Sequence, residues 1–277
     1  MITNPALMCD FYKISHREQY PTKTEKIYST WTARSNKYHP SASFVVAFGI
    51  QSFIKTYLID YFNQNFFFVD KDEIIDEYRR FIKFTLAIDD PETQHLEDLW
   101  DLGYLPIEIR AIEEGTKVPM RVPMLSIENT DPRFFWLTNY LETLLSAELW
   151  LPMTSATIAY QYRVLLDAWC DLTGGDKELV QFQAHDFSMR GLEGLEPSYK
   201  SGAAHLTSFT GTDVIPAICY LEEYYNADIE KELVGCSIPA TEHSVECAGI
   251  ALAEEAFKEK GEWNGYKLED FAQLLEV

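Results

Sequence analysis

Three short clusters of polar residues in the second half of the chain carry side chains that could do chemistry. They are His185-Asp186-Phe187-Ser188-Met189-Arg190-Gly191, Gly211-Thr212-Asp213 and Glu242-His243-Ser244. An imidazole titrates near neutral pH, a carboxylate accepts protons or hydrogen bonds, and a guanidinium matches the geometry of a phosphate. Together these groups indicate a small-molecule site, although an isolated Asp is also an ordinary helix cap and an isolated His an ordinary structural residue.

The elements that would position these clusters are short strands alternating with helices. Apolar stretches at Leu179–His185, Leu206–Phe209 and Val234–Ile238 predict three strands, and Val214–Tyr225 predicts a helix after the second of them. Strands that alternate with helices favour parallel β/α units. Because active sites are built where the carboxyl ends of parallel strands meet, we expect the three clusters to converge on one rim.

The first half of the chain has a different organisation. Apolar residues at helical spacing from Ile50 to Tyr61 predict a helix, and residues 70–84 predict a second, more exposed one. Apolar and polar residues alternate over 104–128, with a turn between the two runs, which predicts antiparallel strands. These patterns indicate a mixed α+β domain.

A long helical region follows the predicted strands. Asp131 can cap free N–H groups and Pro132 fits the first turn, so the two residues predict a helix start. We expect this helix to end at Pro152, because proline removes a hydrogen bond inside a helix. A further helix is expected from about Ser155 to Leu172, closing at Gly174.

Several common catalytic patterns are absent from the sequence. Gly191, Gly194 and Gly202 do not form GxGxxG, and no GxxxxGK[ST] phosphate loop is present. The Glu242-His243 pair lacks the second His of HExxH, and no G-x-S-x-G elbow occurs. Hydrolase and P-loop functions therefore have little support.

The composition and the net charge limit the classes of partner that the chain can bind. Of 277 residues, 47% are hydrophobic, which is enough for a buried core. The chain has 23 basic and 44 acidic residues, and the net charge of −21 argues against non-specific binding to nucleic acid. No apolar run approaches the roughly 18 residues that suggest a membrane span, and the start lacks the features of a secretory signal. We expect neither a nucleic-acid nor a membrane partner.

The cysteines are typical of a reducing compartment. Their number is odd, they are scattered, and no CxxC pair occurs, so a disulfide framework is not expected. Free thiols predict a cytoplasmic protein. The five residues are Cys9, Cys170, Cys219, Cys236 and Cys247.

Separated blocks of residues match one known family in their order and approximate spacing. The blocks are Asp10 to His16, Gln19-Tyr20-Pro21, Glu128 to Pro132, Trp136 to Thr143, His185-Asp186-Phe187 with Arg190-Gly191, Lys200 to His205, Gly211-Thr212-Asp213 and Ser237 to Ser244. Over most of the chain they resemble the nicotinamide phosphoribosyltransferases, which join nicotinamide to 5-phosphoribosyl 1-diphosphate.

The resemblance implies a pocket for the nicotinamide ring. It places Phe187 on one face of the ring and Tyr12, from the second subunit, on the other, which suits a flat, electron-poor base. It places Asp213 opposite the carboxamide, where a carboxylate would repel nicotinic acid and so select the amide. A cap on the helix that begins at Val214 is a second role open to Asp213.

The resemblance also implies a phosphate side of the site. Arg190 and, within a looser match, Arg34 correspond to arginines near the phosphates. Asp10 corresponds to an acidic residue that could lie at the subunit interface. His243 corresponds to the histidine that is phosphorylated when ATP hydrolysis is coupled to synthesis, and Glu242 would help to orient its ring.

The sequence departs from the family pattern in two ways. Ser188 and Met189 replace the more usual Gly and aromatic residue, which would alter the width of the pocket. The family's later segments carry a second arginine, metal and ribose carboxylates and a Gly-rich phosphate loop, and the chain contains none of them. We therefore predict no metal ligands in this chain. Leu268–Val277 is expected to be the helix before the next strand.

The predicted fold class is α/β. An N-terminal α+β domain over 1–177, with antiparallel strands, would provide dimerisation and contacts on the nicotinamide side. Residues 178–277 would form the first part of a TIM-like (β/α) barrel, with about three of its eight strands, so that the barrel is incomplete in this chain.

Three functions remain open at this point. The chain could be the N-terminal part or subunit of a split nicotinamide phosphoribosyltransferase in NAD salvage, with Mg²⁺ accompanying the diphosphate and ATP as coupling nucleotide. It could be a non-catalytic protein that binds nicotinamide or a nucleotide, or a regulatory fragment that docks on an intact relative through the Tyr12 surface. Retention of the pocket residues favours the first. Its partners would be the two substrates and either a second copy or a complementary C-terminal chain, without which we expect no activity.

Overall fold

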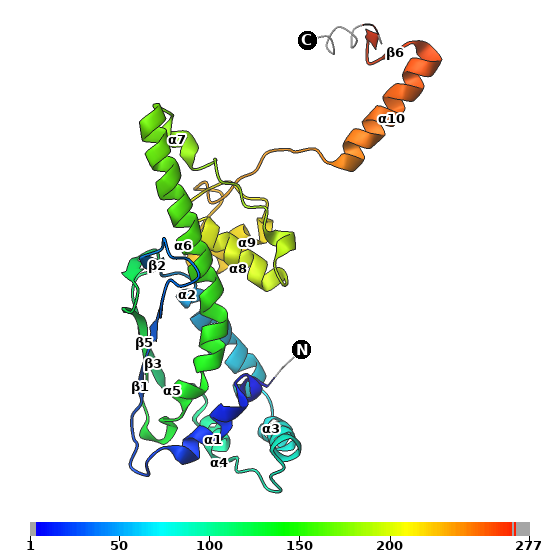
Figure 1. Ribbon diagram of the computed structural model, residues 1–277. Coiled ribbons are helices and arrows are strands. Elements are labelled where there is room, and N and C mark those ends of the chain that lie inside the picture. Colours follow the sequence, from blue (N-terminus) through cyan, green and yellow to red (C-terminus); the bar gives the residue numbers. More distant parts are fainter. Residues whose placement is uncertain (1–3, 268, 270–277) are drawn as a thin grey trace. The chain divides into compact units, whose positions relative to one another are not determined.

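The computed structural model describes residues 4–267 and 269, and its internal contacts divide the chain into two compact units (Figure 1). The first unit extends to Cys236 and the second begins at Ser237. Each unit is described by itself below.

The strands of the first unit form two antiparallel sheets. In the larger sheet β5 (Pro123–Asn129) lies between β1 (Tyr28–Thr32) and β3 (Ile107–Ala111). The smaller sheet pairs β2 (Phe44–Val46) with β4 (Lys117–Pro119). The prediction of antiparallel strands over 104–128 is confirmed, and the fold is mixed α/β.

Register in the larger sheet is set by the central strand. Ile127 of β5 lies opposite Ser29 on one side and Ile109 on the other. Asn129 closes the strand: its Oδ1 accepts the N–H of Ile27 at 2.8 Å. Such side-chain bonds pair backbone groups that would otherwise be orphaned where a strand ends.

Helices cover the sheet and enclose the main core. They are the 3₁₀ turns η1 (Pro5–Leu7) and η4 (Pro132–Phe134), the π-helices η2 (Ile54–Tyr61) and η3 (Asn63–Phe67), and the α-helices α1 (Phe11–Gln19), α2 (Ile50–Phe53), α3 (Lys71–Leu86), α4 (Gln94–Leu102) and α5 (Leu137–Tyr140). Phe66 and Leu149 in this core are fully buried. Both helices predicted in this region are confirmed, although the first is wound largely as π-helix.

The longest helix, α6 (Glu142–Thr173), runs through Pro152 without a break. The predicted end at Pro152 is therefore wrong. Proline inside a helix costs about 3 kcal/mol, and tertiary packing offsets that cost here. Pro152 is buried against Gly49, where a side chain would meet the proline ring at 2.8 Å. The helix ends at Gly174, which adopts a left-handed conformation with φ of 70°, as predicted.

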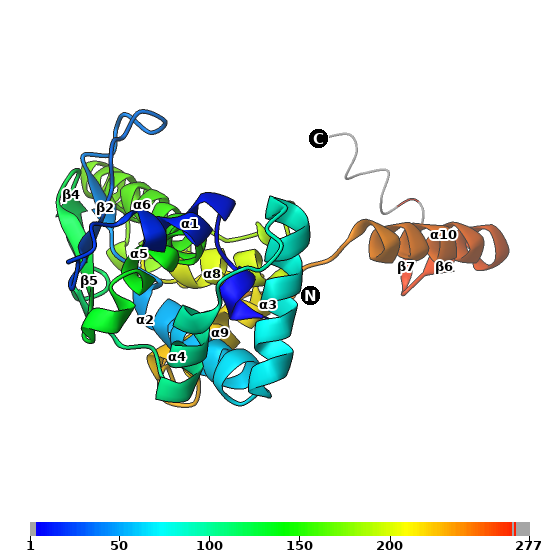
Figure 2. The ribbon, with the colours of Figure 1, turned by 90° about the horizontal axis from the view of Figure 1, so that it is seen from below.

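Short helices complete the first unit and pack against α6. They are α7 (Lys177–Val180), the 3₁₀ turn η5 (Met189–Gly191), α8 (Leu195–His205) and α9 (Ile215–Tyr225), and α9 confirms the predicted helix. Gly202 lets α8 approach α9 closely, because a Cβ at this position would lie 2.8 Å from the Cβ of Ala217. A second apolar core forms where α6, α8 and α9 meet. In Figure 2, α8 lies beside the long green helix, and α9 lies beside α8.

The three predicted strands of the second half are not strands in the structure. Leu179 and Val180 belong to α7, whose first turn is capped by the Asp176 carboxylate at the N–H of Glu178. Leu206–Phe209 forms the turn after α8. The local cap and turn bonds satisfy these backbone groups in place of a ladder. Only two isolated parallel bridges are found in the described residues, Asp186–Thr212 and Gly211–Cys236.

In the described part of the second unit, a helix is followed by a small hairpin. Helix α10 (His243–Lys260) ends at Gly261, and β6 (Glu262–Trp263) pairs with β7 (Tyr266–Lys267). The helix predicted over Leu268–Val277 lies outside the described residues, apart from 269. Across the described chain, no helix combines the length and the apolar character needed to cross a membrane.

Candidate functional site

Backbone hydrogen bonds bring two of the three polar clusters together. The N–H of Asp186 donates to the carbonyl of Gly211 at 3.2 Å, and the N–H of Asp213 donates to the carbonyl of Asp186 at 2.9 Å. On the other side, Thr212 and Cys236 are joined by a hydrogen bond of 2.9 Å. The parallel bridges thus place the residues around 186, 212 and 236 side by side, and the first two clusters converge as predicted.

The centre of this site is a contact between a histidine and a carboxylate. His185 Nε2 lies 2.7 Å from Asp213 Oδ1. The imidazole also lies against the ring of Phe187, with centroids 4.5 Å apart and planes tilted by 34°. Phe187 is 67% exposed, so its ring is accessible to a ligand or partner.

The turn before α9 is held by Thr212, whose hydroxyl accepts the N–H of Val214 at 3.0 Å. Thr212 is buried. The carboxylate of Asp213 contacts His185, and the capping role considered for Asp213 stays a prediction.

Asp186 holds the loop that presents Phe187. It is 8% exposed, and its Oδ1 accepts the N–H of Ser188 at 2.9 Å. Its Oδ2 is buried and has no hydrogen-bond partner among the described residues. Asp186 and His205 line a cavity of about 360 Å³ between the loop and α6. Burial lowers the pKa of His205, whose Nε2 lies 3.1 Å from the carbonyl of Gly211.

Sequence reasoning placed His185 and Asp186 in a polar cluster but assigned no role to either residue or to His205. All three lie in blocks that match the family, close in sequence to Phe187 or Gly211. This placement is the signal that could have marked them as site residues. Arg190, which was predicted, lies exposed in η5, four residues after Asp186.

The second predicted group, Asp10 and Tyr12, lies on α1 beside the start of α6. Tyr12 is 54% exposed and packs edge-on against His16, with ring centroids 4.8 Å apart. Asp10 accepts a hydrogen bond of 2.7 Å from the hydroxyl of Thr143. The buried Lys13 pairs with Glu142 of α6 and anchors this face. Burial lowers the pKa of Lys13, but the hydrogen bonds and charges of Glu142 and Tyr12 together outweigh burial, and the pKa is raised.

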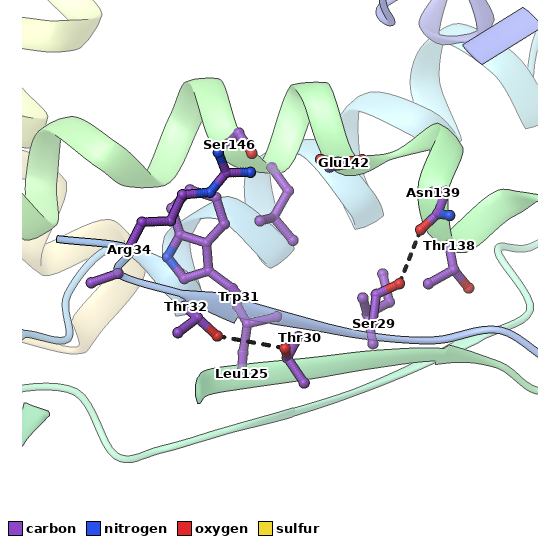
Figure 3. Close-up of a pocket in the computed structure, with 13 residues that line it drawn as sticks. Ser29, Thr30, Trp31, Thr32, Arg34, Leu125, Thr138, Asn139, Glu142 and Ser146 are labelled. Atoms are coloured by element: carbon purple, nitrogen blue, oxygen red, sulfur yellow. Dashed lines mark hydrogen bonds between the residues drawn. The ribbon is translucent and has the colours of Figure 1, made fainter. Parts of the chain in front are cut away.

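Arg34 lies exposed at the mouth of a separate cavity of about 730 Å³ (Figure 3). The lining comes from β1, β5, α5 and the first turns of α6, and is rich in hydroxyl groups. Ser29 donates a hydrogen bond of 2.9 Å to Asn139 across this cavity. In Figure 3 the guanidinium of Arg34 lies beside Ser146.

The two groups of residues lie at different positions along α6. Asp10 contacts Thr143, whereas the cavity next to Asp186 is lined by Ile158 and Tyr162. With a rise of about 1.5 Å per residue, these positions are roughly 20 Å apart along the helix. Within one copy of the chain, α1 and the Phe187 loop therefore belong to separate surfaces.

His243 and Glu242 belong to the second unit. His243 is the first residue of α10, Glu242 precedes it, and both are exposed. The hydroxyl of Ser244 donates to the Glu242 carboxylate. The amino end of a helix favours negatively charged groups, which suits a phosphorylated side chain.

The structure also bears on metal and thiol chemistry. The described residues contain no group of three His, Cys, Asp or Glu side chains arranged to hold a metal ion. All five cysteines lie within the described residues and carry free thiols.

Comparison with known proteins shows which families the chain is similar to. Residues 4–109 match the model described as "Nicotinamide phosphoribosyltransferase, N-terminal domain". This chain is similar to the nicotinamide phosphoribosyltransferases. Residues 182–268 match the nicotinate phosphoribosyltransferase family, so both halves of the chain resemble enzymes acting on related bases.

Curated nicotinamide phosphoribosyltransferases match most of this chain. That of Acinetobacter baylyi is 48% identical over 250 residues, covering 89% of this chain and 49% of that protein. That of Xanthomonas campestris is 34% identical over 248 residues, covering 88% and 48%, and that of Mycoplasma genitalium is 32% identical, covering 92% and 57%. The chain thus spans about half the length of these relatives. The resemblance drawn from the sequence blocks is confirmed.

A solved structure supports the fold. The crystal structure of human nicotinic acid phosphoribosyltransferase matches with a TM-score of 0.59 and 16% sequence identity, over 87% of this chain and 40% of that one. At this identity the likeness concerns the fold alone.

Proposed function

We propose that this chain is the N-terminal part or subunit of a nicotinamide phosphoribosyltransferase, acting in NAD salvage. The reaction joins nicotinamide to 5-phosphoribosyl 1-diphosphate and releases nicotinamide mononucleotide and diphosphate. The observation that carries the proposal is the arrangement of Asp213, His185 and Phe187, in which a carboxylate and an exposed aromatic ring lie at one histidine. The sequence similarity to nicotinamide phosphoribosyltransferases supports it.

The base would lie on the exposed face of Phe187. A flat ring gains about 0.5–1.5 kcal/mol from an aromatic partner beyond the burial of area. The Asp213 carboxylate would accept a hydrogen bond from the carboxamide and repel the carboxylate of nicotinic acid. Because α1 lies about 20 Å along α6 from the Phe187 loop, Tyr12 of a second copy is the one that would close the pocket.

The arginines would bind the phosphates of 5-phosphoribosyl 1-diphosphate. Arg190, next to Phe187 in the chain, is exposed and available to a phosphate, and Arg34 with Asp10 would contribute from the second copy. Mg²⁺ would accompany the diphosphate as part of the substrate. Catalysis would rest on positioning the base nitrogen at C1 and on neutralising the leaving diphosphate.

His243 would accept a phosphoryl group when ATP is the coupling nucleotide. Its exposed ring at the amino end of α10 is accessible to a nucleotide. In the transfer, the imidazole nitrogen forms a bond to the γ-phosphorus and ADP leaves. Glu242 would help to orient the ring.

The proposed assembly is a homodimer or a pair with a complementary C-terminal chain, in the cytoplasm. We further propose an N-terminal domain over 1–177 and, over 178–277, the start of a TIM-like barrel. The two isolated parallel bridges support this, because parallel neighbours are what the first strands of such a barrel require.

Base selection tests the proposed function. Calorimetry should detect saturable nicotinamide binding to the purified chain, with nicotinic acid a poor competitor. Asp213→Asn should improve competition by nicotinic acid about tenfold, because the repelling charge is gone. Glu193→Gln, which removes an exposed carboxylate in the same region, is the control and should change nothing. Equal competition by nicotinic acid for Asp213→Asn and the parent would reject the role of Asp213.

A further inference from the structure

The imidazole of His185 is held on three sides. Its Nε2 lies 2.7 Å from Asp213 Oδ1, and its ring lies 4.5 Å from the ring of Phe187. The third side is Gly211, where a Cβ would lie 2.8 Å from His185 Nδ1. A residue without a side chain at 211 therefore lets the imidazole lie close to the backbone. The side chain of His185 is 22% exposed and that of Asp213 is 47% exposed, so the pair lies at the edge of the site.

These contacts define what the histidine does. A carboxylate is an acceptor only, so the short contact with Asp213 requires a proton on Nε2. Hydrogen bonds to charged acceptors are stronger than those to neutral acceptors. They orient the carboxylate and favour its ionised form. The same ring supports Phe187 from behind. His185 thus joins the two groups that would recognise a base, although it meets neither face of that base itself.

We propose that His185 is the positioning residue of the base site: its Nε2–H holds the Asp213 carboxylate in the orientation that selects a neutral carboxamide, and its ring supports Phe187. The proposal rests on the proposed function. An ionised carboxylate at a fixed position discriminates between amide and acid, whereas a mobile one turns away from a negatively charged ligand. Selectivity should therefore depend on the N–H at this position more strongly than the stability of the chain does.

Replacing His185 by Gln or by Asn distinguishes a positioning role of this residue from a packing role. The Gln amide nitrogen of His185→Gln reaches the place of Nε2, whereas that of His185→Asn ends near the place of Nδ1. Binding of nicotinamide and nicotinic acid is measured by calorimetry on the full chain. We expect His185→Gln to keep the parental preference for the amide within about threefold, and His185→Asn to lose about five- to tenfold of it. His39→Gln is the control, because His39 is exposed and contacts Gln161 of α6; it should retain the preference.

A measurement without ligand tests the same contact. Nitrogen-15 chemical shifts of His185 in the free chain should show the proton on Nε2, and Asp213→Asn should shift that signal. A proton on Nδ1 alone, or equal amide preference in the Gln, Asn and parental chains, would overturn the proposal. If the parent binds neither base, the proposed function fails and this inference with it. If the parent binds nicotinamide and His185→Asn keeps its full preference, only the positioning role fails.

Discussion

At the residue scale, two histidines of the chain differ in their exposure to solvent: the ring of His243 is exposed, and the ring of His95 is buried. His243 meets water at the start of α10. The side chain of His95 is 9% exposed and lies edge-on to Trp136, with ring centroids 4.9 Å apart. An exposed imidazole can accept a phosphoryl group, whereas a buried one serves packing. This contrast leads to one prediction for each.

His243→Ala is predicted to remove ATP-dependent phosphorylation of the chain. The alanine side chain has no nucleophilic nitrogen, so no phosphoramidate can form. Incubation with labelled ATP, followed by acid treatment, measures the acid-labile phosphate. Slow transfer without ATP should persist in any enzyme reconstituted with this variant. Label on the alanine variant at the parental level would place the phosphoryl site elsewhere.

His95 is predicted to make stability fall as the pH is lowered. Burial, with repulsion from Arg17, outweighs the attraction of Glu92 and lowers the pKa of His95 to about 4. The unfolded chain, with an ordinary pKa of about 6.5, takes up a proton first. The contribution is therefore complete above about pH 6.5 and is lost towards pH 4, by about 3 kcal/mol in total. Urea unfolding at pH 7.5 and 4.5 should show a smaller fall for His95→Gln, and an identical fall would contradict the assignment.

At the element scale, the contact between Gly49 and Pro152 decides that α6 is one helix. The ring of Pro152 occupies the space that a side chain at 49 would need, and Gly49 has a φ of 96°. Both features demand glycine, one because of space and the other because of backbone conformation. A continuous α6 in turn carries the surfaces of α1 at its start and of α8 further along.

Gly49→Ala is predicted to lower the free energy of unfolding by about 2–4 kcal/mol, from overpacking against Pro152 and from the left-handed backbone. Gly103→Ala is the matched control: its φ is 80°, and nothing lies within 4 Å of the added Cβ. It should lose only about 1 kcal/mol. Denaturant titration of both variants isolates the effect of the proline contact. Equal losses would mean that this contact is not what constrains the helix.

At the scale of the whole molecule, α6 exposes an apolar stripe that a partner would cover. Its side chains are 38% to 74% exposed and recur every three or four residues, so they lie on one face of the helix. Burying an aliphatic side chain is worth roughly 1.5–3 kcal/mol, and the stripe therefore favours association. It consists of Ile158, Tyr162, Leu165, Trp169 and Leu172.

The purified chain is accordingly predicted to self-associate and to make no nicotinamide mononucleotide when supplied with both substrates and Mg²⁺. In addition to the exposed stripe, the chain spans about half the length of the curated relatives it matches. Light scattering gives the mass in solution, and a product assay gives the activity. Leu165→Glu, on the stripe, should shift the mass towards the monomer. A monomer of the parental chain that turns over unaided would contradict this prediction.

Local patterns were sufficient for much of this protein. The alternation over 104–128, the apolar spacing of 50–61 and the glycine at 174 each act within a few residues, so the sequence alone predicted the strands of 104–128 and the helices over 50–61, 70–84 and 214–225. The blocks around Phe187 and Asp213 likewise carry the resemblance to the nicotinamide phosphoribosyltransferases.

Other features depend on residues far apart in the chain, and only the tertiary structure decided them. Pro152 stays inside a helix because Gly49, about a hundred residues earlier, leaves room for its ring. Of the predicted strands, only isolated bridges remain among the described residues, and their hydrogen bonds join Asp186 to Gly211 and Thr212 to Cys236. Asp213 contacts His185, 28 residues earlier. Sequence patterns record short-range preferences, whereas these outcomes follow from the space and hydrogen bonds that distant segments provide.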